Sequence, residues 1–247
     1  MKIVVLSDTH NFLPDPAEIP ECDVVCLAGD IVPLDYQDDD IASVAWFCLD
    51  FVPWTDKLPC KKVIFIGGNH DFFLEHIMFF KREDGTIKRR TPNEVLKKLL
   101  PGNNKGKHKL IYLCDNSVDI EGKRFYGTPW VGDLSGWAFY KSDPELAEQW
   151  SIIPKKLDVL ITHMPPKCCD MGMVHEAGWN YGRDFGSQEL YDAMMGRDIH
   201  YTFCGHVHSG NHTASEYKPG CFVTNVSYMD EGYRPTNFPA GFPVYEI

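Results

Sequence analysis

The sequence lacks any excess of positive charge. Its 247 residues include 24 Lys and Arg against 35 Asp and Glu, which gives a formal net charge of −11. A protein that follows a nucleic-acid backbone needs clustered Lys and Arg. We therefore expect no extended nucleic-acid surface. A small anionic substrate is still compatible with this composition, because bound cations can reverse the local field.

The sequence also lacks a long hydrophobic run, an internal repeat and a CxxC motif. No stretch is long enough to span a bilayer, and the apolar run in "MKIVVLSDTH" is too short for a secretory signal, so we expect no membrane partner. Nine scattered cysteines, an odd number, are typical of reduced thiols, and we expect this also of the adjacent Cys168 and Cys169. These features predict a cytoplasmic protein and leave its oligomeric state open.

What the sequence does contain is a regular series of apolar runs without an interior shift in composition, which predicts a single domain over residues 1–247. Buried strands are expected at 2–7, 23–29 and 61–68, and shorter strands at 108–113, 117–122, 123–128, 157–163, 200–205, 220–227 and 242–247. Helices are expected at 41–52, 91–100, 143–150 and 187–196. The basic stretch "KREDGTIKRR" reads as a solvated loop or helix end. The pattern indicates a layered α/β fold with mixed sheets.

Polar residues follow five of these runs, at the carboxyl ends where ligands gather in open α/β sheets. They are Asp8, His10, Asp30, Asn69, His70, Asp71, His163, His206 and His208. Each alone has an ordinary explanation as a turn residue or a hydrogen-bonded histidine. Together they indicate metal binding. Oxygen and imidazole ligands without thiolate favour Zn, Mn or Fe, and the paired imidazoles of "GHVH" suggest two ions.

This ordered series, D-x-H, G-D, G-N-H-D, H and G-H-x-H, resembles the calcineurin-like metallophosphoesterase superfamily and runs from Asp8 to His208. The resemblance implies a four-layer α/β/β/α sandwich of two mixed sheets with a dinuclear metal centre at its edge. It further implies two ligand sets joined by a bridging Asp30. One set is Asp8, His10 and His208, and the other is Asn69, His163 and His206.

Three further segments, "FYGTPW", "THMPPKCCD" and "TNVSYMDEGYRPTNFP", resemble the MPPED-type branch of small metallophosphodiesterases. The first of them suggests that Trp130 faces the pocket, with a place in the core as the alternative. Arg183 is the one cation in the long loop "DMGMVHEAGWNYGRDFG". It could hold a phosphate bidentately, although an ordinary exposed arginine is an equal alternative.

Two divalent ions would lower the pKa of a bridging water toward neutrality, which makes a metal-bridging hydroxide the expected nucleophile on phosphorus. His70 is expected to protonate the departing alkoxide, because the adjacent Asp71 would fix its tautomer and raise its pKa. The alternative is that His70 only donates a hydrogen bond within the site.

The sequence therefore predicts a metal-dependent phosphodiesterase acting on a small phosphorylated substrate, a cyclic or linear nucleotide. A protein phosphatase of the same superfamily is disfavoured, because "GDIVPLD" lacks the arginine of the G-D-x-V-D-R-G motif that such enzymes carry. A nuclease is disfavoured by the acidic charge. A non-catalytic scaffold is disfavoured because no ligand of the series is missing.

Overall fold

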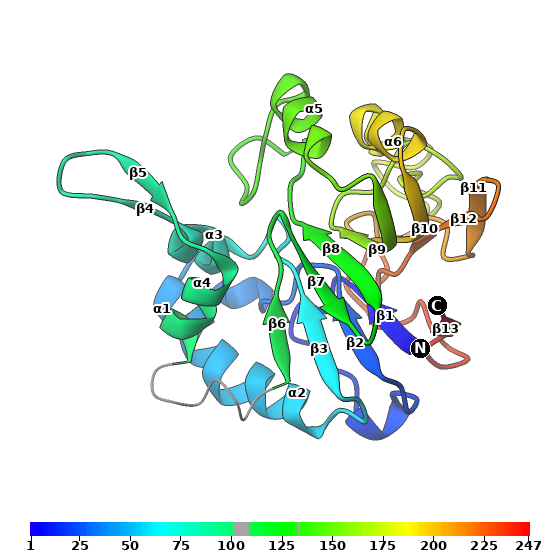
Figure 1. Ribbon diagram of the computed structural model, residues 1–247. Helices are drawn as coiled ribbons and strands as arrows, with labels where there is room; N and C mark the ends of the chain where they lie inside the picture. The colour runs from blue at the N-terminus through cyan, green and yellow to red at the C-terminus, as the bar shows by residue number, and fades with distance from the viewer. Residues whose placement is uncertain (101–108, 133) are drawn as a thin grey trace.

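The computed structural model describes residues 1–100, 109–132 and 134–247. Two mixed β-sheets form its centre (Figure 1), one with the strand order β13-β1-β2-β3-β6 and one with the order β11-β12-β10-β9-β8-β7. The first sheet contains β1 (Lys2–Leu6), β2 (Val24–Leu27), β3 (Lys62–Phe65), β6 (Leu110–Tyr112) and β13 (Val244–Glu246). The second contains β7 (Asn116–Ile120), β8 (Lys123–Thr128), β9 (Lys156–Thr162), β10 (Asp198–Cys204), β11 (Ser215–Lys218) and β12 (Cys221–Asn225).

The two sheets face each other because their central strands are apolar on both sides. Side chains along a strand alternate between its two faces. In β1, Ile3 and Val5 join a buried cluster with Phe125 and Val159 of the other sheet, while Val4 and Leu6 join the cluster beneath the helices. The inner cluster thus lies between the sheets. Each outer face is covered by helices (Figure 1), which confirms the predicted four-layer sandwich.

The helices cover the two sheets in separate groups (Figure 1). The group beside the five-stranded sheet contains α1 (Asp40–Trp46), α2 (Val52–Lys57), α3 (Phe72–Met78) and α4 (Pro92–Leu99), and the other contains α5 (Asp143–Ser151) and α6 (Gln188–Met195). A π-helical segment, Phe47–Phe51, joins α1 to α2, so the helix expected at 41–52 is continuous but not regular. Helix α4 begins with a capping box, in which Thr91 and Glu94 satisfy each other's backbone N–H groups.

The prediction for "KREDGTIKRR" was wrong. This stretch and the residues before it form a hairpin of β4 (Phe79–Lys81) and β5 (Ile87–Arg89), which projects from the body of the molecule (Figure 1). Asp84 closes the turn by accepting hydrogen bonds from the N–H and hydroxyl of Thr86. Because β5 is exposed throughout, it has none of the apolar alternation by which strands are found in a sequence.

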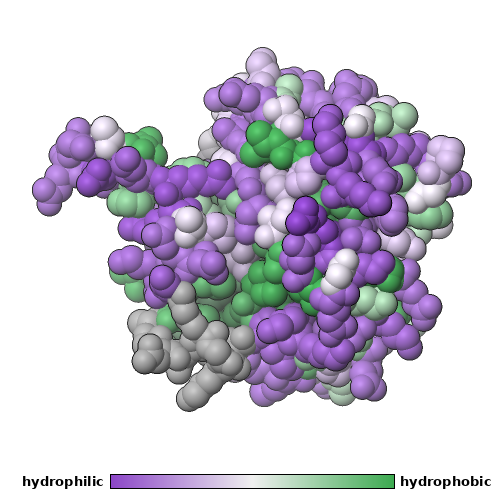
Figure 2. All heavy atoms as spheres, in the orientation of Figure 1, coloured by the Kyte–Doolittle hydropathy of each residue, from purple (hydrophilic) through white to green (hydrophobic). Residues whose placement is uncertain are grey.

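The surface and the cysteines agree with the composition. Hydrophilic residues predominate on the face in Figure 2, where hydrophobic residues form small groups. Among the described residues, none of the helices has the length and apolar character needed to cross a membrane. All nine cysteines are free thiols, as predicted.

Candidate metal centre

The predicted ligands come from the carboxyl ends of five strands, three in one sheet and two in the other. Strands β1, β2 and β3 are parallel neighbours, as are β9 and β10. The loops that follow them are joined by backbone hydrogen bonds, such as Asp8 N to Gly29 O (3.0 Å) and Gly205 N to His163 O (2.9 Å). The sheet edges therefore bring together residues that are up to 200 positions apart in the sequence.

The backbone is strained where it carries these side chains. Asp8, His10, Asp30 and His206 all have positive φ, at 54°, 41°, 52° and 70°. For non-glycine residues this conformation costs on the order of 1–3 kcal/mol each, and it clusters at functional sites. Gly205 lies beside the Asp8 side chain so closely that a Cβ atom would collide with Ser7 and Asp8. These loops are therefore built to hold particular side chains in place.

The first group of ligand atoms is that of Asp8, His10 and His208, which all lie within 4.8 Å of one another. His208 Nε2 is 3.6 Å from Asp8 Oδ1. The Asp8 carboxylate is fixed by the Ser227 hydroxyl, which donates to Oδ2 at 2.7 Å, and by the backbone N–H of His206 at 3.1 Å. These are the three residues of the first ligand set implied by the family resemblance.

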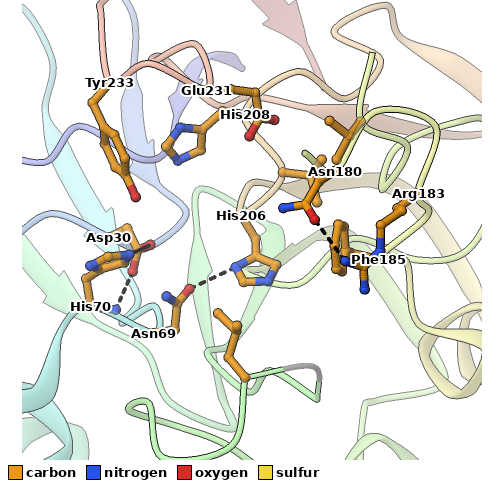
Figure 3. Close-up of a pocket in the computed structure, with 13 residues that line it drawn as sticks. Asp30, Asn69, His70, Asn180, Arg183, Phe185, His206, His208, Glu231 and Tyr233 are labelled. Carbon is orange, nitrogen blue, oxygen red and sulfur yellow. Dashed lines mark hydrogen bonds and ion pairs between the residues drawn. The ribbon is translucent and has the colours of Figure 1, made fainter. Parts of the chain in front are cut away.

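The second group meets at the amide oxygen of Asn69. His206 Nδ1 lies 2.8 Å from Asn69 Oδ1 (Figure 3). His163 Nε2 lies 2.9 Å from the same oxygen. Asp30 lies between the two groups, since its Oδ2 is 3.2 Å from His163 Nε2 and 3.9 Å from His10 Nε2. Asp30 thus lies close to ligand atoms of both groups.

The hydrogen bonding and protonation of the donor side chains also suit divalent metal ions. Both ring nitrogens of His10 are buried and have no hydrogen-bond partner among the described residues. Burial lowers the pKa of His10 to about 3, so its imidazole is neutral, as a metal ligand must be. His163 and His208 each donate from Nδ1 to a backbone carbonyl, Ala28 O at 2.8 Å and Asp230 O at 2.9 Å. Each hydrogen bond directs Nε2 into the site. Metal-binding histidines usually donate their other ring N–H in this way.

The centre also concentrates negative charge in the interior. Burial favours the neutral form of Asp30, but the charges of His163 and His70 outweigh this and hold the pKa of Asp30 well below its usual range. Burial opposes charging of His163 as well, yet the carboxylate of Asp30 raises the pKa of His163 to about 10. The two carboxylates thus attract positive charge, and a divalent cation bound at His163 would replace the proton that Asp30 favours there.

His70 reaches the centre, but its partner is not Asp71. His70 Nδ1 hydrogen-bonds to the side-chain oxygen of Gln37, and His70 Nε2 lies 3.8 Å from Asp30 Oδ2. An amide oxygen can only accept, so Nδ1 carries the proton of that bond and Nε2 faces the site. Burial lowers the pKa of His70, which opposes the rise expected from a carboxylate partner. Since the imidazole also lies within 4.8 Å of His10 and Asp30 ligand atoms, both an acid and a ligand role are within its reach.

Asp71 holds the Asp30 loop instead. Its carboxylate is completely buried and accepts backbone hydrogen bonds from Gly68, Asp30, Ile31 and Val32, at 2.8, 2.9, 3.2 and 3.1 Å. The expectation that Asp71 orients His70 was therefore wrong, because its two oxygens are already taken by main-chain donors. Asp71 is a positioning residue for the bridging carboxylate.

A pocket of about 390 Å³ opens over the centre (Figure 3). Arg183 lines it, with its guanidinium over the Phe185 ring and its Nη1 donating to Asn180 Oδ1 at 2.9 Å. Trp130 does not line this pocket. Its indole is buried beside Phe139, and its N–H donates to Asp115 at 2.9 Å, so the alternative of a place in the core is the correct one.

Three features around the centre were not predicted from the sequence. Gln37 precedes α1 and reaches His70 across 33 residues. Tyr233 lies with its ring centroid 5.1 Å from those of His10 and His208, and it has a positive φ of 56°. Asp230 orders this turn by accepting from the N–H groups of Gly232 and Arg234. Tyr233 belongs to the tail motif that resembles the MPPED-type branch, but a spacing does not reveal which side chain of the motif faces His10 and His208.

A layered α/β sandwich with carboxylate, amide and imidazole donors at its sheet edges defines a metallophosphoesterase fold. The model of the calcineurin-like phosphoesterase family matches residues 1–210, and the chain belongs to this family. It is 30% identical over 246 residues to the human metallophosphoesterase domain-containing protein 1, a match that covers 96% of this chain and 69% of that protein.

Two further comparisons found chains of similar sequence or similar fold. The chain is 27% identical over 219 residues to the UPF0046 protein T07D4.2 of Caenorhabditis elegans, which covers 85% of this chain but only about half (52%) of that protein. A solved crystal structure matches with a TM-score of 0.58 at 13% identity, over 91% of this chain and 89% of its own. At that identity the likeness shows the fold alone.

Proposed function

We propose that this protein is a dinuclear metal-dependent phosphoesterase that hydrolyses a small phosphodiester, a cyclic or linear nucleotide. The observation that carries the proposal is the pair of donor groups on either side of Asp30, one containing His10 with two unpartnered ring nitrogens. Membership of the calcineurin-like phosphoesterase family supports the same class of reaction.

One metal ion would be held by Asp8, His10 and His208. The other would be held by Asn69, His163 and His206, and Asp30 would contact both ions. The donor set suits Mn, Fe or Zn. When bound, such a pair supplies an activated water and positive charge for the phosphoryl oxygens. The chain's own contribution is to fix the carboxylates through Ser227 and Asp71 and to keep the imidazole Nδ1 atoms occupied by main-chain carbonyls.

His70 would donate a proton from Nε2 to the departing oxygen of the ester. Because Nδ1 already carries the proton shared with Gln37, this role requires the doubly protonated imidazolium, which burial opposes and the carboxylate of Asp30 favours. Gln37 occupies the opposite ring nitrogen and so holds the imidazole with Nε2 toward Asp30. In a general acid the proton must be within hydrogen-bond reach of the leaving group, and this orientation meets the requirement on the protein side. Arg183 would bind the substrate at the rim of the pocket, where Asn180 and Phe185 hold its guanidinium.

We favour a diester over a monoester as the substrate because of the charge of the pocket. Among the described residues that line it, Arg183 is the one Lys or Arg, and it is accompanied by Glu231. A monoester dianion would place more negative charge beside that carboxylate than a diester monoanion does. A phosphomonoesterase or protein phosphatase is therefore the second candidate. The free cysteines fit a cytoplasmic location.

The test compares bis-p-nitrophenyl phosphate with p-nitrophenyl phosphate after chelation and reconstitution with Mn, Fe or Zn, followed by a panel of nucleotides and a DNA oligonucleotide. We expect no turnover after chelation, restored turnover with metal, and a kcat/KM at least about tenfold higher on the diester, a difference of about 1.4 kcal/mol. A higher value on the monoester would refute the diesterase assignment. If neither ester is turned over with any of these metals, the proposed enzymatic activity is refuted.

A further inference from the structure

A pair of cysteines lies at the ends of β2 and β3 opposite to the metal centre. Cys22 and Cys60 each stand two residues before their strand, and the parallel register pairs Val24 with Lys62, so the two cysteines face each other. The N–H of Cys22 donates to Pro59 O at 3.1 Å, which extends the pairing to this point. Neighbouring strands lie about 4.7–4.9 Å apart, within the Cα separation of about 4.4–6.8 Å that a disulfide spans.

The pair can be reached from solvent. Cys22 and Cys60 both line a surface hollow of about 590 Å³, together with Lys2, Asp23 and Lys61. Cys26 lies two residues further along β2, but it is completely buried in the cluster between the sheets. An oxidant in the hollow therefore meets Cys60 and Cys22 and not Cys26.

The two thiols differ in reactivity. The adjacent Cys22 side chain and the ammonium of Lys109 lower the pKa of Cys60 despite partial burial. Its neighbour Cys60 and burial raise the pKa of Cys22. Lys109 is held there by donating to Leu58 O at 2.8 Å. A thiol that ionises more readily than its neighbour is suited to attack, and the neighbour is suited to resolve the product.

We propose that Cys22 and Cys60 are a modification site at which a hydroperoxide closes a reversible disulfide. The Cys60 thiolate attacks the terminal peroxide oxygen, the O–O bond breaks, and the departing hydroxide of hydrogen peroxide, or the alkoxide of an organic hydroperoxide, takes a proton and leaves as water or an alcohol. Cys22 then loses its proton as its sulfur attacks the sulfenic sulfur of Cys60. The S–S bond forms, the S–O bond breaks, and water leaves. Two thiols are oxidised and one peroxide is reduced.

The test treats the full-length protein with hydrogen peroxide, blocks remaining thiols with N-ethylmaleimide, and maps the peptides by mass spectrometry. We expect two fewer free thiols than the nine of the reduced protein, one peptide pair linked through Cys22 and Cys60, and full reversal by dithiothreitol. The assay needs neither metal nor turnover, so its outcome is independent of the proposed enzyme activity.

Variants assign the order of the steps. Cys22→Ser should lose the cross-link and accumulate sulfenic acid on Cys60, which dimedone captures, whereas Cys60→Ser should leave Cys22 unmodified. Cys48→Ser is the matched control, a half-buried thiol bonded to Leu99 O at 3.0 Å, and should keep the cross-link. Nine thiols surviving in the wild type, or a cross-link that maps to Cys26 or to Cys168 and Cys169, would overturn the proposal.

Discussion

Replacing Asp71 by Asn tests whether this residue holds the Asp30 loop. Asp71 Oδ2 accepts from the N–H groups of Asp30 and Gly68, and Oδ1 accepts from Ile31 and Val32. An amide keeps only one oxygen, so two buried N–H groups would face an NH₂ group and lose their acceptor. Leaving a buried donor unsatisfied costs about 1–3 kcal/mol, so with two such donors we expect the free energy of unfolding to fall by about 2–6 kcal/mol.

The assay is urea unfolding of the chelated protein, so that metal binding does not contribute to the difference. Asp119→Asn is the control, because its carboxylate pairs only with Arg124 on the exposed surface and its loss should matter much less. Turnover of Asp71→Asn, measured with metal, should fall equally on esters with good and poor leaving groups, since Asp71 does not contact His70. A stability equal to that of Asp119→Asn would refute the hydrogen-bond account. A loss confined to poor leaving groups would mean that Asp71 serves the acid after all.

Three further predictions concern the centre itself. His70→Ala should lower turnover of a nucleotide diester by about 10²–10⁴-fold and turnover of the p-nitrophenyl diester much less, with two metal ions retained. Equal losses on both esters together with an emptied metal site would show that His70 is a ligand. Gln37→Leu should give a weaker form of the same selectivity, and an unchanged leaving-group dependence would show that the Gln37 contact is not used. Asp30→Asn should nearly abolish activity and lower metal content toward one ion per chain by elemental analysis, whereas two tightly held ions with normal turnover would place the bridge elsewhere.

The sequence was sufficient for the strands that carry the ligands and for the edge at which the ligands meet. Asp8, Asp30 and His163 each follow a buried apolar run, and parallel strands necessarily bring their carboxyl ends together. Helix α4 was equally accessible, because Thr91 and Glu94 form a local capping signal. Features fixed by neighbours in the chain could be predicted.

The contacts of His70 and Asp71 could not be predicted, because adjacency in the sequence does not show in which direction a side chain points. Asp71 precedes α3 with a φ of −87° and a ψ of 53°, and its carboxylate turns back to a loop 40 residues upstream. The His70 ring points the other way, to Gln37, which no motif marks. The indole of Trp130 is buried in the core, where its N–H donates to Asp115 in the connection between β6 and β7. Such details are decided by tertiary packing.

The most direct test of the dinuclear centre is anomalous X-ray scattering from crystals of the protein reconstituted with manganese. We expect two peaks per chain, one among Asp8, His10 and His208 and the other among Asn69, His163 and His206, with Asp30 in contact with both. A single peak, or a peak coordinated by His70 in place of Asn69, would contradict the account.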